Sequence, residues 1–383
     1  MTPSIYLDYN ATTPVDPAVR AALLPFLEGG FGNPSSSYGL GREAAAAIST
    51  ARNQLAELLG TRASELVFTS SGTESTKAAF LSALSHQPEK RHIITSSVEH
   101  SATKLLCLDL EKQGYEITWL LVNNEGQLSL EQLKTAITPA TALISLLWGN
   151  NETGVLFPME KIAAIAAKKN VLLHVDAVQV VGKIPIALAS LPVSYLSLSG
   201  HKIYAPKGVG ALYVHRHAPY KPLFQGSQEE GRRGGTENVA SIVALGEAAK
   251  VAQQVLSAEA TREAVLRDRL EAGLCSKIKN VRRNGAQKER LPNTTHLTFG
   301  GIDAATALLL LDQEGICCSA GSACNTASRD PSPVLTAMGR SREEASAGLR
   351  FSLGRFTTEA EIDRALEIIP RVIEKLRRVK VSF

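Results

Sequence analysis

Apolar and polar positions along the chain predict short buried strands that alternate with amphipathic helices. Short continuous apolar runs fit buried strands, whereas apolar residues spaced three and four apart fit helices. The expected strands are 66–69, 92–95, 117–121, 142–146, 171–175, 195–198 and 211–214. The expected helices are 42–59, 74–84, 102–112, 130–136 and 159–167. This alternation predicts βαβ units and an α/β fold with a mostly parallel, seven-stranded sheet.

The pattern changes after Asn238, where helices become longer. The expected elements there are helices 239–255 and 258–277, a strand 294–298, a helix 304–314 and a final amphipathic helix 359–378. We therefore expect a large domain over 16–256 and a smaller α+β domain formed by 1–15 and 257–383. The chain is expected to cross between them at the proline-containing stretch 14–17.

Composition narrows the class of protein. The 383 residues are 44% hydrophobic and 20% charged, which is ordinary for a soluble globular protein whose core needs no disulfides. The longest apolar run, 304–311, is too short to span a bilayer. The net charge of +4 does not indicate nucleic-acid binding. The basic run 375–380 fits a solvated face of the final helix.

The number of cysteines and the first ten residues both bear on the cellular compartment. The five cysteines are an odd number and do not resemble a secreted disulfide framework. Residues 1–10 have neither a basic start nor an apolar core of a signal peptide. We expect a cytoplasmic protein with reduced thiols, no membrane contact and no direct nucleic-acid partner.

Four candidate features fall at the ends of strands, where ligands of open α/β sheets bind. Gly72 and Thr73 open a helix after the strand 66–69, so free backbone N–H groups there predict an anion site. A capped helix without a ligand fits equally well. Asp176 follows a buried strand and needs a positive partner, such as the protonated ring nitrogen of a pyridine cofactor. Gln179 could bond a ring hydroxyl, and a helix-capping role for Asp176 also stays open.

Lys202 follows the strand 195–198 and lies among small and polar residues. It could carry a Schiff base, with Ser199 and His201 binding a phosphate. Taken alone, the segment fits a surface lysine better.

Small residues surround Cys324, which predicts an exposed loop whose thiol becomes a nucleophile if its pKa is lowered. The spacing of Cys318 and Cys324 is not C-x-x-C, so we expect no metal site. Cys317 and Cys318 are expected to pack at a strand end.

In this order, the segments resemble the cysteine desulfurases of the NifS/IscS type, which are class V aminotransferases of the fold-type I pyridoxal-phosphate enzymes. The resemblance covers nearly the whole chain, over 6–14, 32–36, 99–100, 149–154, 176–179, 199–202, 233–238, 321–324 and 349–355. The last two segments indicate a desulfurase. The sequence departs from the family at Tyr38, where many relatives carry histidine, and at 325–327.

The resemblance implies the cofactor pyridoxal 5'-phosphate and assigns roles around its ring. Lys202 is expected to bind the cofactor aldehyde, Asp176 to pair with the ring nitrogen and His100 to stack on the ring. Gln179 and Asn151 are expected on the side of the ring oxygen.

Further implied roles concern the phosphate and the substrate. The residues expected at the phosphate are Gly72, Thr73, Ser199 and His201, joined by Thr236 of the partner subunit in a homodimer. Arg350 is expected to bind the substrate carboxylate, with Asn151 nearby, and Cys324 to receive the sulfur.

The implied function is removal of sulfur from L-cysteine, giving L-alanine and a persulfide on Cys324. The catalytic residues are then Lys202, Cys324 and His100, which shuttles the proton of the substrate thiol. The sulfur passes to an acceptor protein, and a scaffold for iron–sulfur clusters and a tRNA-thiolation protein both stay open. A selenocysteine lyase or another class V lyase or aminotransferase is the alternative enzyme. A non-catalytic interaction protein is disfavoured because Lys202 and Asp176 are both present.

Overall fold

The computed structural model describes residues 4–321 and 331–381. Its strands are β1 Ile5–Tyr6, β2 Leu66–Thr69, β3 His92–Ser96, β4 Glu116–Leu120, β5 Thr141–Leu147, β6 Leu172–Asp176, β7 Tyr195–Ser199, β8 Gly210–Val214, β9 Val281–Arg283, β10 Thr294–Phe299, β11 Ile316–Cys317 and β12 Gly348–Ser352. Its α-helices are α1 Pro17–Leu23, α2 Pro25–Glu28, α3 Gly39–Leu59, α4 Gly72–His86, α5 Ser101–Lys112, α6 Leu130–Ala136, α7 Met159–Lys168, α8 Val239–Lys277, α9 Ala304–Gln313, α10 Pro333–Ala337, α11 Arg342–Ser346 and α12 Glu359–Val381.

The largest sheet of the described residues confirms the α/β prediction. Its seven strands have the order β2-β8-β7-β6-β5-β3-β4. β3 to β7 pair in parallel, and β8 runs antiparallel to both of its neighbours, β2 and β7. β8 is the exception because only the short connection 200–209 joins it to β7, and a short connection suits antiparallel pairing.

Apolar side chains cover this sheet on both faces. On one face Leu66 and Phe68 of β2 share a core with residues of α3, α7 and α8. On the other face Val67 packs in a core with residues of α4 and α5. Successive residues of a strand point to opposite faces, which explains the continuous apolar runs in the sequence.

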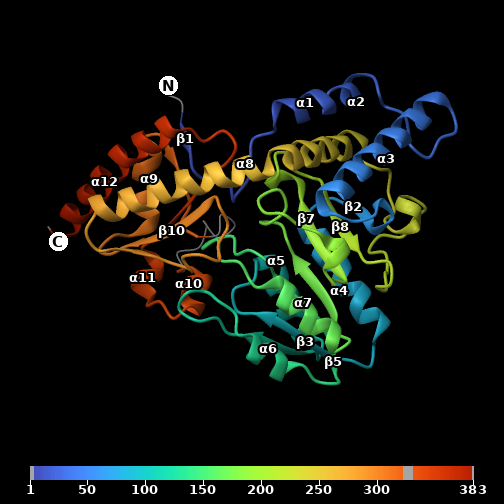
Figure 1. Ribbon diagram of the computed structural model, residues 1–383, viewed down its shortest axis with the longest axis horizontal. Coiled ribbons are helices and arrows are strands. Elements are labelled where there is room, and N and C mark those ends of the chain that lie inside the picture. Colours follow the sequence, from blue (N-terminus) through green and yellow to red (C-terminus); the bar gives the residue numbers. More distant parts are fainter. Residues whose placement is uncertain (1–3, 322–330, 382–383) are drawn as a thin grey trace.

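A second group of elements forms its own core. The antiparallel sheet β12-β10-β9 and the parallel pair β1-β11 pack with α9, α12 and the second half of α8. The first strand belongs here, since Ile5 pairs with Ile316 and Asp8 bridges to Ser352. Figure 1 shows this part at the left, around α12, α9 and β10. The expected division at residues 15 and 256 stays a prediction, and the cores do not follow it throughout, because Leu291, Val334, Leu335 and Met338 pack in the core of the large sheet.

α8 corrects one expectation. The sequence predicts two helices that meet near Ser257, but residues 239–277 form one helix that runs along both parts of the molecule in Figure 1. Ser257 keeps its backbone N–H and so does not interrupt the helix, whereas a proline at this position would. Among the described residues α8 alone is long and apolar enough to cross a membrane, and its buried residues pack in the two cores as those of a core helix do.

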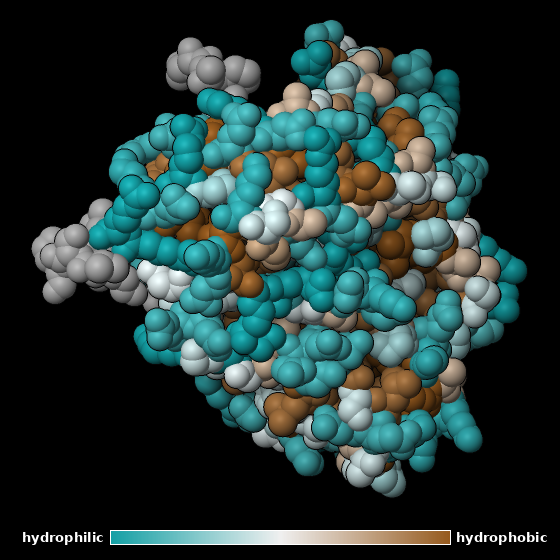
Figure 2. Space-filling model, turned by 60° about the vertical axis from the view of Figure 1, so that its left-hand side comes forward, coloured by the Kyte–Doolittle hydropathy of each residue, from teal (hydrophilic) through white to brown (hydrophobic). Residues whose placement is uncertain are grey.

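The last helix presents a hydrophilic face. Val372 and Ile373 are buried in the smaller part, whereas Arg371, Lys375 and Arg378 are exposed. Figure 2 shows the side of the molecule that carries α12, and this surface is mostly hydrophilic. The expected solvated face is therefore confirmed up to residue 378.

Candidate active site

One cavity of about 230 Å³ lies at the carboxyl ends of β2, β6 and β7. Ten of the residues predicted from the sequence line it, namely Gly72, Thr73, His100, Asn151, Asp176, Gln179, Ser199, His201, Lys202 and Arg350. They come from six separate segments of the chain. The fold therefore brings together nearly all of the expected site.

The beginning of α4 forms one end of the cavity. Ser71 caps this helix by accepting a hydrogen bond from the backbone N–H of Glu74, and Gly72 and Thr73 follow it. A Cβ atom at Gly72 would lie 2.7 Å from Cγ2 of Val178, so a larger residue here would require Val178 to move. Ser199 ends β7 on the same side. Backbone N–H groups at a helix start and a hydroxyl nearby suit an anion such as phosphate.

Asp176 is a buried carboxylate at the end of β6. It is 8% exposed, and its Oδ1 accepts a hydrogen bond from the backbone N–H of Val178 at 3.0 Å. Burial raises the pKa of Asp176, and the nearby His100 and Lys202 oppose this rise. A carboxylate in such a place is stabilised by a cationic or protonated partner, which the ring nitrogen of a pyridine cofactor supplies.

The two histidines of the cavity are held in their neutral form. His100 caps α5, and its Nδ1 accepts a hydrogen bond from the backbone N–H of Ala102 at 3.2 Å. Burial lowers the pKa of His100. Burial and the charge of Lys202 lower the pKa of His201 to about 4. A neutral imidazole can accept a proton on its unprotonated nitrogen, which in His100 is Nδ1, so taking a proton from a thiol would replace the bond from Ala102.

Lys202 lies in the short 3₁₀ turn Gly200–Lys202 after β7. Its Nζ donates hydrogen bonds to the carbonyl oxygens of Asn10 and Ala11, the second at 2.7 Å. These carbonyls belong to the N-terminal segment, which reaches the cavity from the smaller part. The surface-lysine alternative does not describe this position.

Arg350 of β12 enters the same cavity and is 1% exposed. Its Nη2 donates to Asp8 at 2.6 Å and its Nη1 donates to the carbonyl oxygen of Asn151 at 2.9 Å. Its Nε is buried without a hydrogen-bond partner among the described residues. An unpaired buried donor costs free energy, and a substrate carboxylate is the kind of group that satisfies it.

Two predicted residues remain. Thr236 is exposed on the loop before α8 and does not line the cavity, and Cys324 lies outside the described residues. Cys318 packs against the core of the smaller part, as expected, and burial keeps the pKa of its thiol well above the ordinary value.

Three polar lining residues were not predicted, and only one of them had a signal in the sequence. Asn10, Ser71 and Thr76 also line the cavity. Asn10 lies within the segment 6–14, which resembles the family but predicts no role for this residue. Ser71 and Thr76 carry no signal beyond their place at the start of a helix.

Comparisons with known proteins agree with this geometry. The aminotransferase class-V family model matches residues 5–365. Cysteine desulfurase 2 of Trichormus variabilis is 50% identical over 376 residues, which cover 98% of this chain and 94% of that protein. Cysteine desulfurase NifS of Azotobacter vinelandii is 46% identical, covering 98% of this chain and 94% of that protein.

A solved structure shows the same fold. A NifS-like protein superposes with a TM-score of 0.92 and 36% identity, covering 97% of this chain and 100% of that one. The match to the family model, the full-length identity and the superposition all lead to one conclusion: the chain belongs to the class-V aminotransferases and, among them, to the NifS-like cysteine desulfurases.

Proposed function

We propose that this protein removes sulfur from L-cysteine with pyridoxal 5'-phosphate, releases L-alanine and holds the sulfur as a persulfide on Cys324. One observation carries the proposal. A single cavity gathers a lysine, a buried aspartate, a helix start and a buried arginine with an unpaired donor. The family uses this cofactor, and the full-length relatives are cysteine desulfurases.

The residues of the cavity fit each polar group of the cofactor: its aldehyde, ring nitrogen, phosphate and ring oxygen. Lys202 would hold the aldehyde carbon and Asp176 the ring nitrogen. The start of α4 with Ser199 would hold the phosphate, and Gln179 with Asn151 the ring oxygen. When bound, the cofactor withdraws electrons from the α-carbon of the amino acid, which weakens the bonds to that carbon.

The side chains of the cavity then bind the substrate and move its protons. Arg350 binds the carboxylate of L-cysteine and fixes its orientation. Lys202 takes the proton from the α-carbon, and the neutral His100 accepts the proton of the substrate thiol. The Cys324 thiolate attacks the substrate sulfur, so that a sulfur–sulfur bond forms as the carbon–sulfur bond breaks. The carbon that loses sulfur takes a proton and becomes the methyl group of alanine.

The persulfide passes to an acceptor protein in the cytoplasm, and the acceptor is a scaffold for iron–sulfur clusters or a tRNA-thiolation protein. We place the enzyme in a homodimer, in which Thr236 of the partner subunit reaches the phosphate. Two features support the dimer. Thr236 is exposed and does not line the cavity of its own subunit. Leu27, Phe31 and Tyr38 are large apolar or aromatic side chains that are 65%, 81% and 56% exposed near α2.

The decisive experiment is incubation of the purified holoenzyme with L-cysteine. Mass spectrometry of the intact protein should show the addition of one sulfur atom, located on the peptide that contains Cys324. Alanine should appear in equal amount in the first turnover. Alanine without a sulfur adduct, or pyruvate in its place, would contradict the proposal.

A further inference from the structure

A buried lysine lies behind the cavity, and the proposed reaction gives it no role. Lys183 is 9% exposed and follows Gln179 by four residues. Its Nζ donates to Oε1 of Gln179 at 2.8 Å and to Oδ1 of Asn10 at 3.4 Å. Burying a charged amine costs free energy, so a lysine at this position needs hydrogen-bond partners that offset the cost.

These contacts fix the orientation of the Gln179 carboxamide. Its oxygen accepts from Lys183, and its nitrogen donates one N–H to the carbonyl oxygen of Asn10 at 3.0 Å. A carboxamide nitrogen has a second N–H. Gln179 also lines the cavity, so the group that it can offer there is this donor. Without Lys183 the carboxamide could rotate and offer its oxygen.

Asn10 connects Lys183 to the opposite side of the site. Its side chain accepts from Asn293 at 3.1 Å and donates to Thr294 at 2.9 Å, so it is tied to β10 and the residue before it. Its carbonyl oxygen accepts from both Gln179 and Lys202. Lys183 thus supports Asn10, which orients Gln179 and Lys202, the two side chains expected on one edge of the cofactor.

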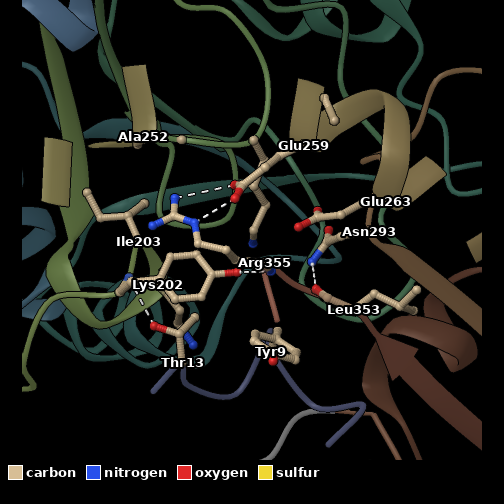
Figure 3. A pocket seen from close by; sticks show the side chains of 14 residues that line it. Tyr9, Thr13, Lys202, Ile203, Ala252, Glu259, Glu263, Asn293, Leu353 and Arg355 are labelled. Carbon is tan, nitrogen blue, oxygen red and sulfur yellow. Dashed lines mark hydrogen bonds and ion pairs between the residues drawn. The ribbon is translucent and has the colours of Figure 1, made fainter. Parts of the chain in front are cut away.

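A second cavity, of about 10 Å³, is lined by both Lys183 and Lys202. Figure 3 shows Glu259, Glu263 and Arg355 around it, with the carboxylate of Glu263 turned inward. The charged and titratable groups facing Lys183 are Lys202, Glu259, Glu263, Arg350, Arg355, Tyr9, Tyr204 and His201. Burial and the charge of Lys202 lower the pKa of Lys183 to about 7, while Glu263 opposes them.

We propose that Lys183 is a positioning residue, which holds Gln179 as a hydrogen-bond donor toward the ring oxygen of the cofactor and favours the ionised form of that oxygen. This inference rests on the proposed function, which places Gln179 at that oxygen. A donor and a nearby positive charge both stabilise an oxygen anion.

The test compares three holoenzyme variants by absorbance. Lys183→Met removes both the charge and the donor at similar length, Lys183→Arg keeps them, and Lys168→Met on α7 is the exposed control. We expect Lys183→Met to raise the dissociation constant of pyridoxal phosphate about tenfold. The midpoint of the pH titration of the visible absorbance should move to higher pH by about one unit. Lys183→Arg should largely restore both values, and Lys168→Met should change neither.

A folded Lys183→Met variant with an unmoved absorbance midpoint would overturn the inference, even if its melting temperature changed, because the role of Lys183 would then be structural only. Should that variant not fold, Lys183→Gln takes its place. It keeps a donor without the charge, and its midpoint should move upward by less. An unmoved midpoint there also rejects the inference. A wild-type protein that stays colourless with pyridoxal phosphate would instead reject the proposed function.

Discussion

The guanidinium of Arg350 lies 2.6 Å from the carboxylate of Asp8, at the point where the N-terminal segment meets β12. This ion pair uses one edge of the guanidinium and fixes its plane. Since Nη1 also donates to the carbonyl oxygen of Asn151, the orientation of the guanidinium is set before a substrate binds. Preorganisation of this kind lowers the entropy that substrate binding must overcome.

Removing this side chain should weaken substrate binding more than turnover. We expect Arg350→Ala to raise the KM for L-cysteine about 100-fold, because charge-assisted hydrogen bonds to the carboxylate are lost. The kcat should change much less. Steady-state alanine formation measures both constants, and Arg282→Ala, an arginine of β9 outside the cavity, is the control. An unchanged KM would show that the carboxylate binds elsewhere.

Lys202 should be required for the colour of the protein as well as for its activity. We expect Lys202→Ala to lose the visible absorbance that appears when the wild-type protein binds pyridoxal phosphate, because the covalent bond to the cofactor aldehyde needs the amine of this lysine. Turnover should fall to background. The spectrum and an alanine assay on the same sample test both points. A coloured and active variant would assign the covalent bond to another lysine.

Cys324 should be needed for sulfur transfer and not for cofactor binding. We expect Cys324→Ser to keep the absorbance spectrum and to form no sulfur adduct from L-cysteine. Cys318→Ser is the matched control, since burial keeps the pKa of the Cys318 thiol far above neutral and the thiolate is therefore scarce. Normal desulfuration by Cys324→Ser would identify another thiol as the acceptor. Selenium release from selenocysteine by that variant, with no sulfur release from cysteine, would favour the lyase alternative.

Glu263 should make stability depend on pH. Burial, with the charge of Glu259, raises the pKa of Glu263 from 4.5 to about 8. A carboxyl whose pKa is raised by folding contributes stability below pH 4.5, and this contribution is lost as pH rises from there to about 8. Glu263→Gln should therefore raise the melting temperature at pH 8.5 by about 2–4 °C and change it little at pH 5. The same increase at both pH values would disprove the assignment.

The large sheet could be predicted because its strands are buried on both faces. The predicted strands 142–146 and 171–175 are mostly apolar, and the structure has β5 at Thr141–Leu147 and β6 at Leu172–Asp176, so their class is visible in the sequence and their ends are visible to within one residue. The polar residues at those ends, Asp176 above all, then mark the site.

The remaining contacts depend on segments that are far apart in the chain. β1, of two residues, has no periodicity that could reveal its pairing with β11. Lys183 gives a similar example, because a lysine is normally exposed and only the packing of α8 and the N-terminal segment buries it. No local pattern records either contact.

The pairing of Asn10 with Ser352 has a consequence for synthesis of the protein. The backbone N–H of Asn10 donates to the hydroxyl of Ser352, and Asp8 holds Arg350 nearby. A ribosome makes these partners some 340 residues apart. The N-terminal segment must therefore wait, unpaired, until nearly all of the chain has emerged, and a nascent polypeptide cut short before β12 cannot assemble its active site whatever the state of its large sheet.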